Sequence, residues 1–532
     1  MKKKLSRSSK PVQNQTQGWA GFSALILAVI VAGVFPLFFR NQFFDINRVK
    51  ISLLQCSAVV CAVACAALWV TDHAVHHSWR SVTLPKVTLA DIGITLFAAS
   101  AAIATWLSDD RQQALTGEAG RRSGLLFILT LYLMYLVLSR GLNMRRWLVI
   151  LYFAAGVAAA LLGVLNFYKI DPLGFYQNMK ESQVASFLST IGNINFFGLY
   201  LCMVLCAGCA LFLHADFKTA IPCGAGLFVC FYGVIASRSD GAMLGVALLF
   251  ALVLFYALTD CARLARTAVI ICLYGAALLC VHTVGVCTDW YGYPFLGGLC
   301  EVLVKSNAPL YLTAAGAAFA LLAWLGQRRG VKLPGKRLRA VMAVLSGAAV
   351  VAVVALMIYF TCVNPQAQAG ALTQFLRFDD AWGTYRGFVW IRSLVAYSQL
   401  GWLQKLIGVG PDTMRYVLAA YRDSTIETAA SGVFENCHNE YLQYLVTTGA
   451  LGLTGYVLLA AGSIRNALRS AHSLEGLALV LMLCVYAPLA FVNVNQPVTV
   501  VQFFFAASLA ACMRNSAPSP IEKVGRAKGV GA

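Results

Sequence analysis

The histidine at position 438 has the type and the setting that proton transfer requires. It lies in the segment Glu435–Gln443, directly before an apolar stretch that starts near Tyr441. A neutral imidazole accepts a proton near neutral pH, and a protonated one supplies positive charge, so His438 is a candidate base or cation. The plain alternative is a solvated histidine beside Asn439, whose side chain is suited to cap the helix that follows.

Three arginines could supply fixed positive charge. Arg386 and Arg392 lie in one short segment, and Arg386 and Trp390 are four residues apart, which places them on one face of a helix. Arg238 lies in a very short turn between two apolar runs. A guanidinium stays protonated and binds phosphate oxygens in a bidentate manner. The alternatives are an amphipathic loop helix resting on lipid for Arg386, and snorkelling or pairing with Asp240 for Arg238.

Two further segments predict local turns near these residues. Gly192–Asn195 precedes an apolar run, and Asn193 is a candidate cap for the helix that this run predicts. Gly408–Pro411 permits a tight turn of the backbone. Each signal is weak by itself.

The elements that must position these residues are membrane helices. The chain has 532 residues, of which 59% are hydrophobic and 12% charged, and its mean hydropathy is +0.72. Ordinary soluble domains are about 45–50% apolar and about 25% charged, so this composition excludes a soluble enzyme. The net charge is +19, and the basic residues that cause it lie between long apolar runs. It therefore indicates a membrane surface, and no nucleic-acid partner is expected.

A bilayer core of about 30 Å needs about 20 apolar residues per helix, and this length predicts about fourteen membrane spans in an all-α integral membrane protein. The predicted starts lie near Trp19, Ile51, Thr88, Gly124, Trp147, Asn195, Ala220, Gly241, Thr267, Leu310, Ala340, Tyr441, Leu474 and Val500.

Most of the 41 Lys and Arg residues fall in the connections on the side of the N-terminus. The positive-inside rule then predicts that both termini are cytoplasmic and that the first span is uncleaved. We expect a cytoplasmic tail at 1–18, transmembrane helices at 19–190, 191–360 and 441–513, and a cytoplasmic tail at 514–532. The long connection 361–440 is expected outside and folded, with a helix from Thr384 to Gln399.

Several classes of function lack the residues that they need. No Asp or Glu falls in the middle of a predicted span, which disfavours an ion-coupled transporter. Nucleotide-binding and zinc-protease motifs are missing, so the energy must come with the substrate. Asp379–Asp380 could hold Mg²⁺, but a solvated loop segment is favoured. The 17 cysteines lie mostly inside apolar runs, although Cys287 and Cys300 could pair in an oxidising compartment.

Taken together, the order and spacing of the motifs resemble the O-antigen ligase superfamily, which also contains O-antigen polymerases and bacterial protein O-oligosaccharyltransferases. The resemblance covers roughly residues 190 to 460 and hardly reaches the first 190, which are expected to serve packing. It rests on a multispanning bundle with one large late outer loop and on Gly-Asn-x-Asn at 192–195, Ser-Arg at 237–238, Arg-x3-Trp at 386–390, Gly-x-Gly at 408–410 and His-Asn-x-Tyr-Leu-Gln at 438–443. The proline that often precedes Gly-x-Gly is absent.

The resemblance implies transfer of a glycan from an undecaprenyl diphosphate carrier to an acceptor hydroxyl outside the cytoplasmic membrane of a bacterium. It implies that His438, Arg386 and Arg238 match the essential histidine and arginines of the family. We expect His438 and Arg386 to be catalytic and Arg238 to bind the diphosphate, because a guanidinium binds phosphate oxygens and stays charged. Arg392, Asn193, Asn439 and Tyr441 are further expected substrate contacts. No cofactor or metal is expected.

Direct attack by the acceptor would invert the anomeric centre, and no strong enzyme nucleophile is evident. The alternatives are a polymerase that joins lipid-linked repeat units and, in a different class, a non-enzymatic permease or flippase for lipid-linked glycan.

Overall fold

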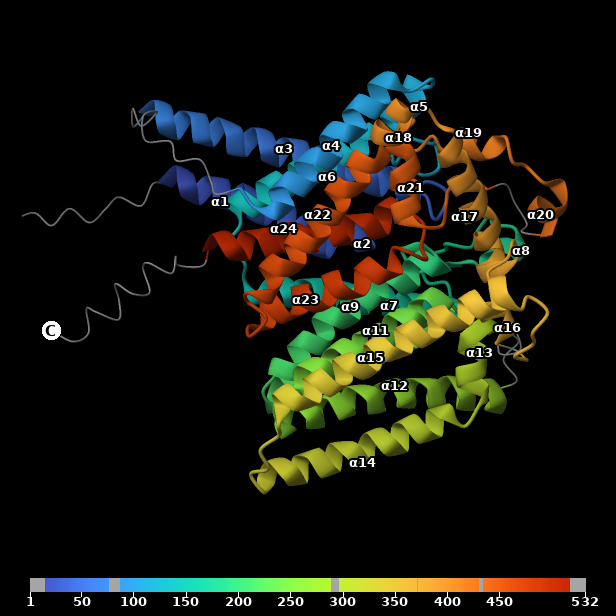
Figure 1. The fold of residues 1–532 in the computed structure, drawn as a ribbon. Helices are drawn as coiled ribbons and strands as arrows, with labels where there is room; N and C mark the ends of the chain where they lie inside the picture. The colour runs from blue at the N-terminus through green and yellow to red at the C-terminus, as the bar shows by residue number, and fades with distance from the viewer. Residues whose placement is uncertain (1–14, 76–86, 289–295, 371, 430–433, 517–532) are drawn as a thin grey trace, which may run out of the picture.

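The computed structural model describes residues 15–75, 87–288, 296–370, 372–429 and 434–516. The predicted tails therefore lie largely outside the described residues. The described chain is almost entirely helical (Figure 1). Its strands β1 (Phe187–Leu188) and β2 (Gly192–Asn193) form one short antiparallel pair, in which Phe187 faces Asn193. The predicted all-α class is confirmed.

Ten helices or helix pairs of the described residues are long and apolar enough to cross a membrane. They are α3 (Ile46–Val75), α4 (Leu89–Leu107), α7 (Arg146–Phe167), α9 (Ile194–His214), α10 (Phe217–Ala236), α11 (Asp240–Ala257), α12 (Cys261–Cys287), α14 (Ala308–Arg328), α15 (Gly335–Ile358) with η4 (Tyr359–Val363), and α21 (Glu440–Thr447) with α22 (Gly449–Leu468).

Four shorter apolar helices complete the bundle. They are α1 (Gln15–Val29) continued by η1 (Ile30–Val34) and α2 (Phe35–Leu37), and then α6 (Leu125–Gly141), α23 (Leu474–Leu489) and α24 (Pro497–Ser516). The long and short helices begin close to the predicted starts. For the four shorter ones, a role as a membrane span stays a prediction.

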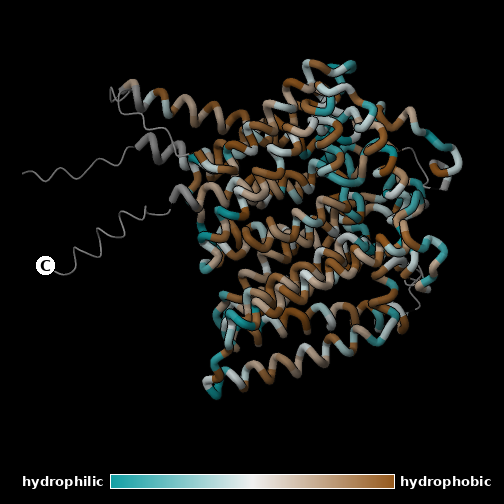
Figure 2. The backbone as a smooth tube through the Cα atoms, in the orientation of Figure 1, coloured by the Kyte–Doolittle hydropathy of each residue, from teal (hydrophilic) through white to brown (hydrophobic). Residues whose placement is uncertain are grey.

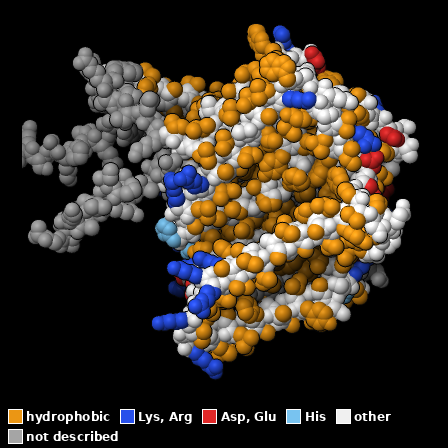
Figure 3. Space-filling view, in the orientation of Figure 1, with side chains coloured by type: hydrophobic (Ala, Val, Ile, Leu, Met, Phe, Trp, Pro, Cys, Tyr) orange, Lys and Arg blue, Asp and Glu red, His pale blue; other side chains and the backbone are white. Residues whose placement is uncertain are grey.

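The face of the bundle shown in Figure 3 is largely apolar, and Figure 2 shows that hydrophobic residues run along its helices. Helix α15 has no buried residue, and the side chains of Val350 and Val351 are 64% and 68% exposed. By contrast, nearly all of α9 is buried, so α9 lies at the centre of the bundle. Because such large apolar faces are not stable in water, this surface fits a lipid environment.

An early helix and a late helix pack at backbone distance. Glycines make this possible, because a Cβ atom at Gly93 of α4 would overlap the backbone of Leu459, and one at Gly455 of α22 would overlap that of Phe97. Small residues let membrane helices approach closely, where dispersion contacts are strongest. The N-terminal helices are thereby joined to the segment that follows His438.

Short helices gather at one end of the bundle, on the right in Figure 1. They are α5 (Arg111–Thr116), α8 (Glu181–Val184), α13 (Gly298–Lys305), α16 (Thr373–Leu376), α17 (Trp382–Gln399), α18 (Trp402–Ile407), α19 (Met414–Ala419) and α20 (Ser424–Ala429). The α14–α15 connection lies at the opposite end. It carries the exposed side chains of Arg328, Arg329, Lys332, Lys336 and Arg337.

The long connection is folded, as predicted, and shares a hydrophobic cluster with Leu442 and Val446 of α21. Phe388, Val389 and Trp390 of α17 pack there with Met414 and Leu418 of α19. The predicted start of the helix at Thr384 is wrong by two residues. Gly383, Thr384 and Tyr385 have left-handed backbone angles, so regular helix begins only at Arg386.

The pairing of Cys287 with Cys300, left open above, does not form. All 17 cysteines are free thiols, and Cys300 is buried with its Sγ 3.5 Å from the carbonyl oxygen of Ile235, whereas Cys287 is exposed at the end of α12. The thiol of Cys300 therefore belongs to the interior packing.

Candidate functional site

His438 is held in a left-handed conformation, with φ of 49°. Both neighbours are fixed by other elements. The indole Nε1 of Trp390 donates to the carbonyl of Cys437 at 2.9 Å, and Asn439 caps α21 by accepting from the amide of Leu442 at 3.1 Å. A non-glycine residue adopts this conformation at a cost, and such strain is concentrated at functional sites. The packing of α17 against α21 thus dictates where the imidazole lies.

The surroundings of His438 favour its neutral form. Burial is the main cause, and the positive charges of Arg386 and then Arg121 add to it, so that the pKa of the imidazole is lowered to about 4. Desolvation and like charges both oppose protonation. At neutral pH the ring therefore carries a free lone pair and no charge.

Arg386 is the first residue of the regular part of α17, and its side chain is directed back to the loop. Its Nη1 donates to the carbonyl of Gly383 at 2.9 Å, and its Nε is buried with no partner among the described residues. Burial lowers the pKa of the guanidinium, and the opposing charge of Asp240 raises it. A buried donor without a partner is rare in proteins. It marks Arg386 as a residue with binding capacity left for an anion.

The next residue, Gly387, is required sterically. A Cβ atom there would overlap the carbonyl oxygen of Asp379. The Arg386–Gly387 pair therefore lets the loop before α17 fold tightly over the start of the helix.

Arg238 occupies the turn between α10 and α11, with φ of 52°, and its Nη2 donates to the carbonyl of Ala185. The hydroxyl of Ser239 donates to Asn195 Oδ1 at 2.8 Å, so the turn is joined to the start of α9. Asp240, two residues after Arg238, is close enough to Arg386 for its charge to act on that guanidinium. The 238–240 turn therefore lies near the start of α17.

The other predicted contacts have well-defined partners within the protein. Arg392 forms an ion pair with Asp380 at 3.1 Å, and its guanidinium lies 4.6 Å from the ring centre of Phe388. Asn193 caps α9 by accepting from the amide of Asn195 at 2.9 Å. Tyr441 donates to the carbonyl of Ala487 at 2.7 Å. The capping alternative is therefore confirmed for Asn193 and Asn439, and Asp380 is engaged by an arginine.

Directly behind the histidine segment lies a buried carboxyl group. The side chain of Glu440 is fully buried and accepts from the hydroxyls of Tyr456 at 2.9 Å and Tyr486 at 2.6 Å. These bonds tie the residue two positions after His438 to α22 and α23. A fully buried carboxyl group needs such partners, and the two hydrogen bonds hold it in place.

The Gly-x-Gly element is hydrogen-bonded to the backbone where α21 ends and α22 begins. The amide of Val409 donates to the carbonyl of Val446 at 3.2 Å, and that of Gly410 donates to Thr447 at 2.9 Å. Gly408 has φ of 99°, and a Cβ atom there would overlap the carbonyl of Thr447. These bonds place Asp412 beside the histidine segment. They do so although this chain lacks the proline that often precedes the Gly-x-Gly element.

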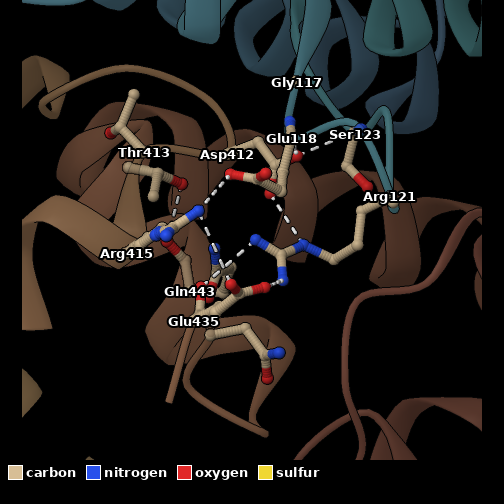
Figure 4. A network of polar contacts seen from close by, with 12 residues as sticks. Gly117, Glu118, Arg121, Ser123, Asp412, Thr413, Arg415, Glu435 and Gln443 are labelled. Carbon is tan, nitrogen blue, oxygen red and sulfur yellow. Dashed lines mark hydrogen bonds and ion pairs between the residues drawn. The ribbon is translucent and has the colours of Figure 1, made fainter. Parts of the chain in front are cut away.

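One residue of the site was not predicted. Arg121, in the α5–α6 connection, reaches between Asp412 and Glu435 of the long connection (Figure 4), at 3.0 Å and 3.2 Å. Its charge is one of those that lower the pKa of His438. The only signal in the sequence was the charged outer stretch Glu118–Arg122, because the resemblance hardly reaches it.

Comparison with known proteins bears on the second half of the chain. Residues 295–457 match the family model described as O-antigen ligase. The match contains Arg386, Gly408, Gly410 and His438, whereas Arg238 and Arg121 lie before it. No curated protein sequence matches the chain.

Proposed function

We propose that the chain is a membrane glycosyltransferase of the O-antigen ligase superfamily, and the match of residues 295–457 to the O-antigen ligase family model supports this proposal. It moves a glycan from an undecaprenyl diphosphate carrier to an acceptor hydroxyl, without a metal ion and with inversion. One observation carries the proposal. Inside the matched region, a buried arginine with an unpartnered donor lies beside a histidine that is neutral at physiological pH.

The arginines hold the diphosphate of the donor in this proposal. When the bond between the anomeric carbon and the phosphate oxygen breaks, the bonding electrons remain on that oxygen. Preplaced cations stabilise this charge most strongly in a site from which water is excluded. Arg386 and Arg238 take this role, and Arg392, whose charge Asp380 balances, contributes from the edge of the site.

His438 is the proposed general base. The acceptor oxygen attacks the anomeric carbon on the face opposite the diphosphate, and its proton passes to the imidazole. A base with a pKa near 4 is weak, but the negative charges of the arriving diphosphate raise that pKa. The proton leaves His438 for solvent or for the departing diphosphate, which restores the neutral ring.

We propose that the site faces away from the cytoplasm, in the inner membrane of a bacterium. The separation of charge along the bundle supports this orientation. Exposed basic residues are concentrated in the α14–α15 connection, at the end opposite the short helices (Figure 3). Basic connections lie on the cytoplasmic side in most membrane proteins.

The test uses the purified full chain in proteoliposomes with a lipid-linked glycan and an acceptor glycolipid. We expect release of undecaprenyl diphosphate together with a glycosylated acceptor, and loss of both in His438→Ala. His472→Ala, in the exposed α22–α23 connection, is the matched control and retains activity.

The products distinguish the alternatives. Lengthening of the glycan while it is still on its carrier would indicate a polymerase. Movement of the lipid across the bilayer with no release of undecaprenyl diphosphate would refute an enzyme and indicate a flippase.

A further inference from the structure

The N-terminal helices contribute a buried arginine to the histidine site. The side chain of Arg121 is only 8% exposed, and each of its three nitrogens meets a group of the long connection. Nε donates to Asp412 at 3.0 Å, Nη1 to the carboxylate of Glu435 at 3.2 Å, and Nη2 to the carbonyl oxygen of Glu435 at 3.3 Å. Because each of its three nitrogens already has a partner, Arg121 differs from Arg386, whose buried Nε has none among the described residues.

The partner of Arg121 is itself built into the α5–α6 connection. Asp412 is left-handed, with φ of 57°, and its carboxylate accepts from the amides of Glu118 at 2.7 Å and Ser123 at 3.3 Å. The side chain is 2% exposed. A buried carboxylate is retained only where it is paired and hydrogen-bonded, as this one is. The contact therefore fixes two distant parts of the chain to each other.

This contact ends three residues before His438. Arg121 binds both the side chain and the backbone of Glu435, and the next residue, Asn436, accepts from the amide of His438 at 3.0 Å. The path from the guanidinium to the imidazole thus runs through consecutive residues of one short segment. On the other side, Cys437 and Asn439 are fixed by α17 and α21.

We propose that Arg121 is a positioning residue for His438: it holds the 435–438 segment in place and sets a fixed positive charge beside the imidazole. The inference rests on the proposed function, in which His438 receives the proton of the acceptor. It assigns to the first 190 residues a part in the reaction, in place of packing alone.

Several charged groups surround His438, and they differ in how they face it. Arg386 on α17 and Arg121 on the α5–α6 connection both oppose its protonation. The carboxylates of Asp412 and Glu435 are turned to Arg121, and that of Glu440 is turned to tyrosines of α22 and α23. Removing the charge of Arg121 therefore takes away one of the two cations that oppose protonation of the imidazole, and the pKa of His438 rises.

The experiment measures kcat/KM for glycan transfer between pH 3.5 and pH 8, because the acid limb of this profile reports the base of the free enzyme. In Arg121→Gln we expect the acid limb to move upward by roughly 0.4 to 1.5 pH units. Shifts of this order follow from Coulomb's law for one unit charge that acts from beyond hydrogen-bond contact, at effective dielectric constants of about 80 to 20. A residue that only holds the fold would lower activity without moving the limb.

Two variants serve as controls. Arg121→Lys keeps the charge but loses the planar fork, so the limb stays in place while kcat falls. Arg415→Gln removes a half-exposed arginine whose nitrogen lies 3.5 Å from Glu118 and 3.7 Å from Glu435. It touches the same network without acting on His438, and its limb is expected to match that of the unmodified protein.

The outcomes separate this inference from the proposed function. If His438→Ala is inactive but Arg121→Gln leaves the acid limb unmoved, the role of Arg121 is overturned and the proposed function stands. If His438→Ala is fully active, the proposed function itself fails. Arg121→Met replaces the glutamine variant if that does not fold. Should both fail to fold while Arg121→Lys folds, the cation serves the fold only, and the inference is overturned.

Discussion

Replacement of Arg386 by lysine tests the charge that meets the departing diphosphate. In the structure the guanidinium uses one nitrogen for the carbonyl of Gly383, at 2.9 Å, and keeps a buried Nε without a partner among the described residues. A lysine at this position retains the charge but presents a single ammonium group. It cannot grip two phosphate oxygens in one plane.

The magnitude follows from the loss of one preplaced donor. Removing such a donor from an anion-stabilising site costs on the order of 3 kcal/mol, or about a hundredfold or more in rate. Stability changes much less. The bond to Gly383 contributes about 1.5–3 kcal/mol, but the variant also removes a buried donor whose desolvation costs about 1–3 kcal/mol. These two effects oppose each other, so the expected net change in the free energy of unfolding is about 1 kcal/mol or less.

The assay compares kcat/KM for transfer with the thermal unfolding temperature of the same detergent-solubilised preparation. Arg328→Lys, at the opposite end of the bundle, is the matched substitution and keeps its activity. Transfer by Arg386→Lys within fivefold of the unmodified protein, with intact folding, would show that Arg386 does not bind the diphosphate.

Three further predictions follow from the geometry. Because the pKa of His438 is lowered to about 4, its neutral form persists from pH 8 to pH 6, and kcat/KM for transfer falls only as the pH approaches 4; a fall centred near pH 6.5 would contradict this. Gly449→Ala places a side chain at φ of 70° against the backbone of Leu406 and lowers the unfolding free energy by about 2 kcal/mol or more; Gly347→Ala, on open α15, lowers it little, and equal unfolding temperatures would refute the reasoning. A variant with Cys362 as its only cysteine, exposed in η4, reacts in intact cells with a membrane-impermeant maleimide; labelling only after lysis would reverse the proposed orientation.

Much of the helical architecture can be predicted from the local composition of the sequence. Apolar runs of membrane-spanning length predict helices wherever they occur, since the backbone must satisfy its own hydrogen bonds in lipid. The starts near Asn195 and Gly241 therefore agree with α9 and α11, and the polar stretch 361–440 is folded, with a hydrophobic cluster that it shares with α21. Left-handed angles at Gly383–Tyr385 escaped prediction, because the helical pattern of α17 extends through them.

Some residues of the candidate site could likewise be predicted from the sequence, and one could not. Residue types and the order of motifs singled out His438, Arg386 and Arg238, because a candidate base and permanently charged side chains can be identified from the sequence alone. The role of Arg121 could not be predicted from the sequence, because its partners Asp412 and Glu435 lie about 300 residues later in the chain.

By itself, then, the sequence determined an apolar helical protein, the types of its reactive groups and the segments that carry them. Only the tertiary structure decided which of these groups remain available. It engaged Arg392 with Asp380, assigned Asn193 and Asn439 to helix caps, and left the Nε of Arg386 without a partner among the described residues. The physical reason is that burial and charge act through space, so the protonation state of an imidazole depends on neighbours that chain order does not reveal.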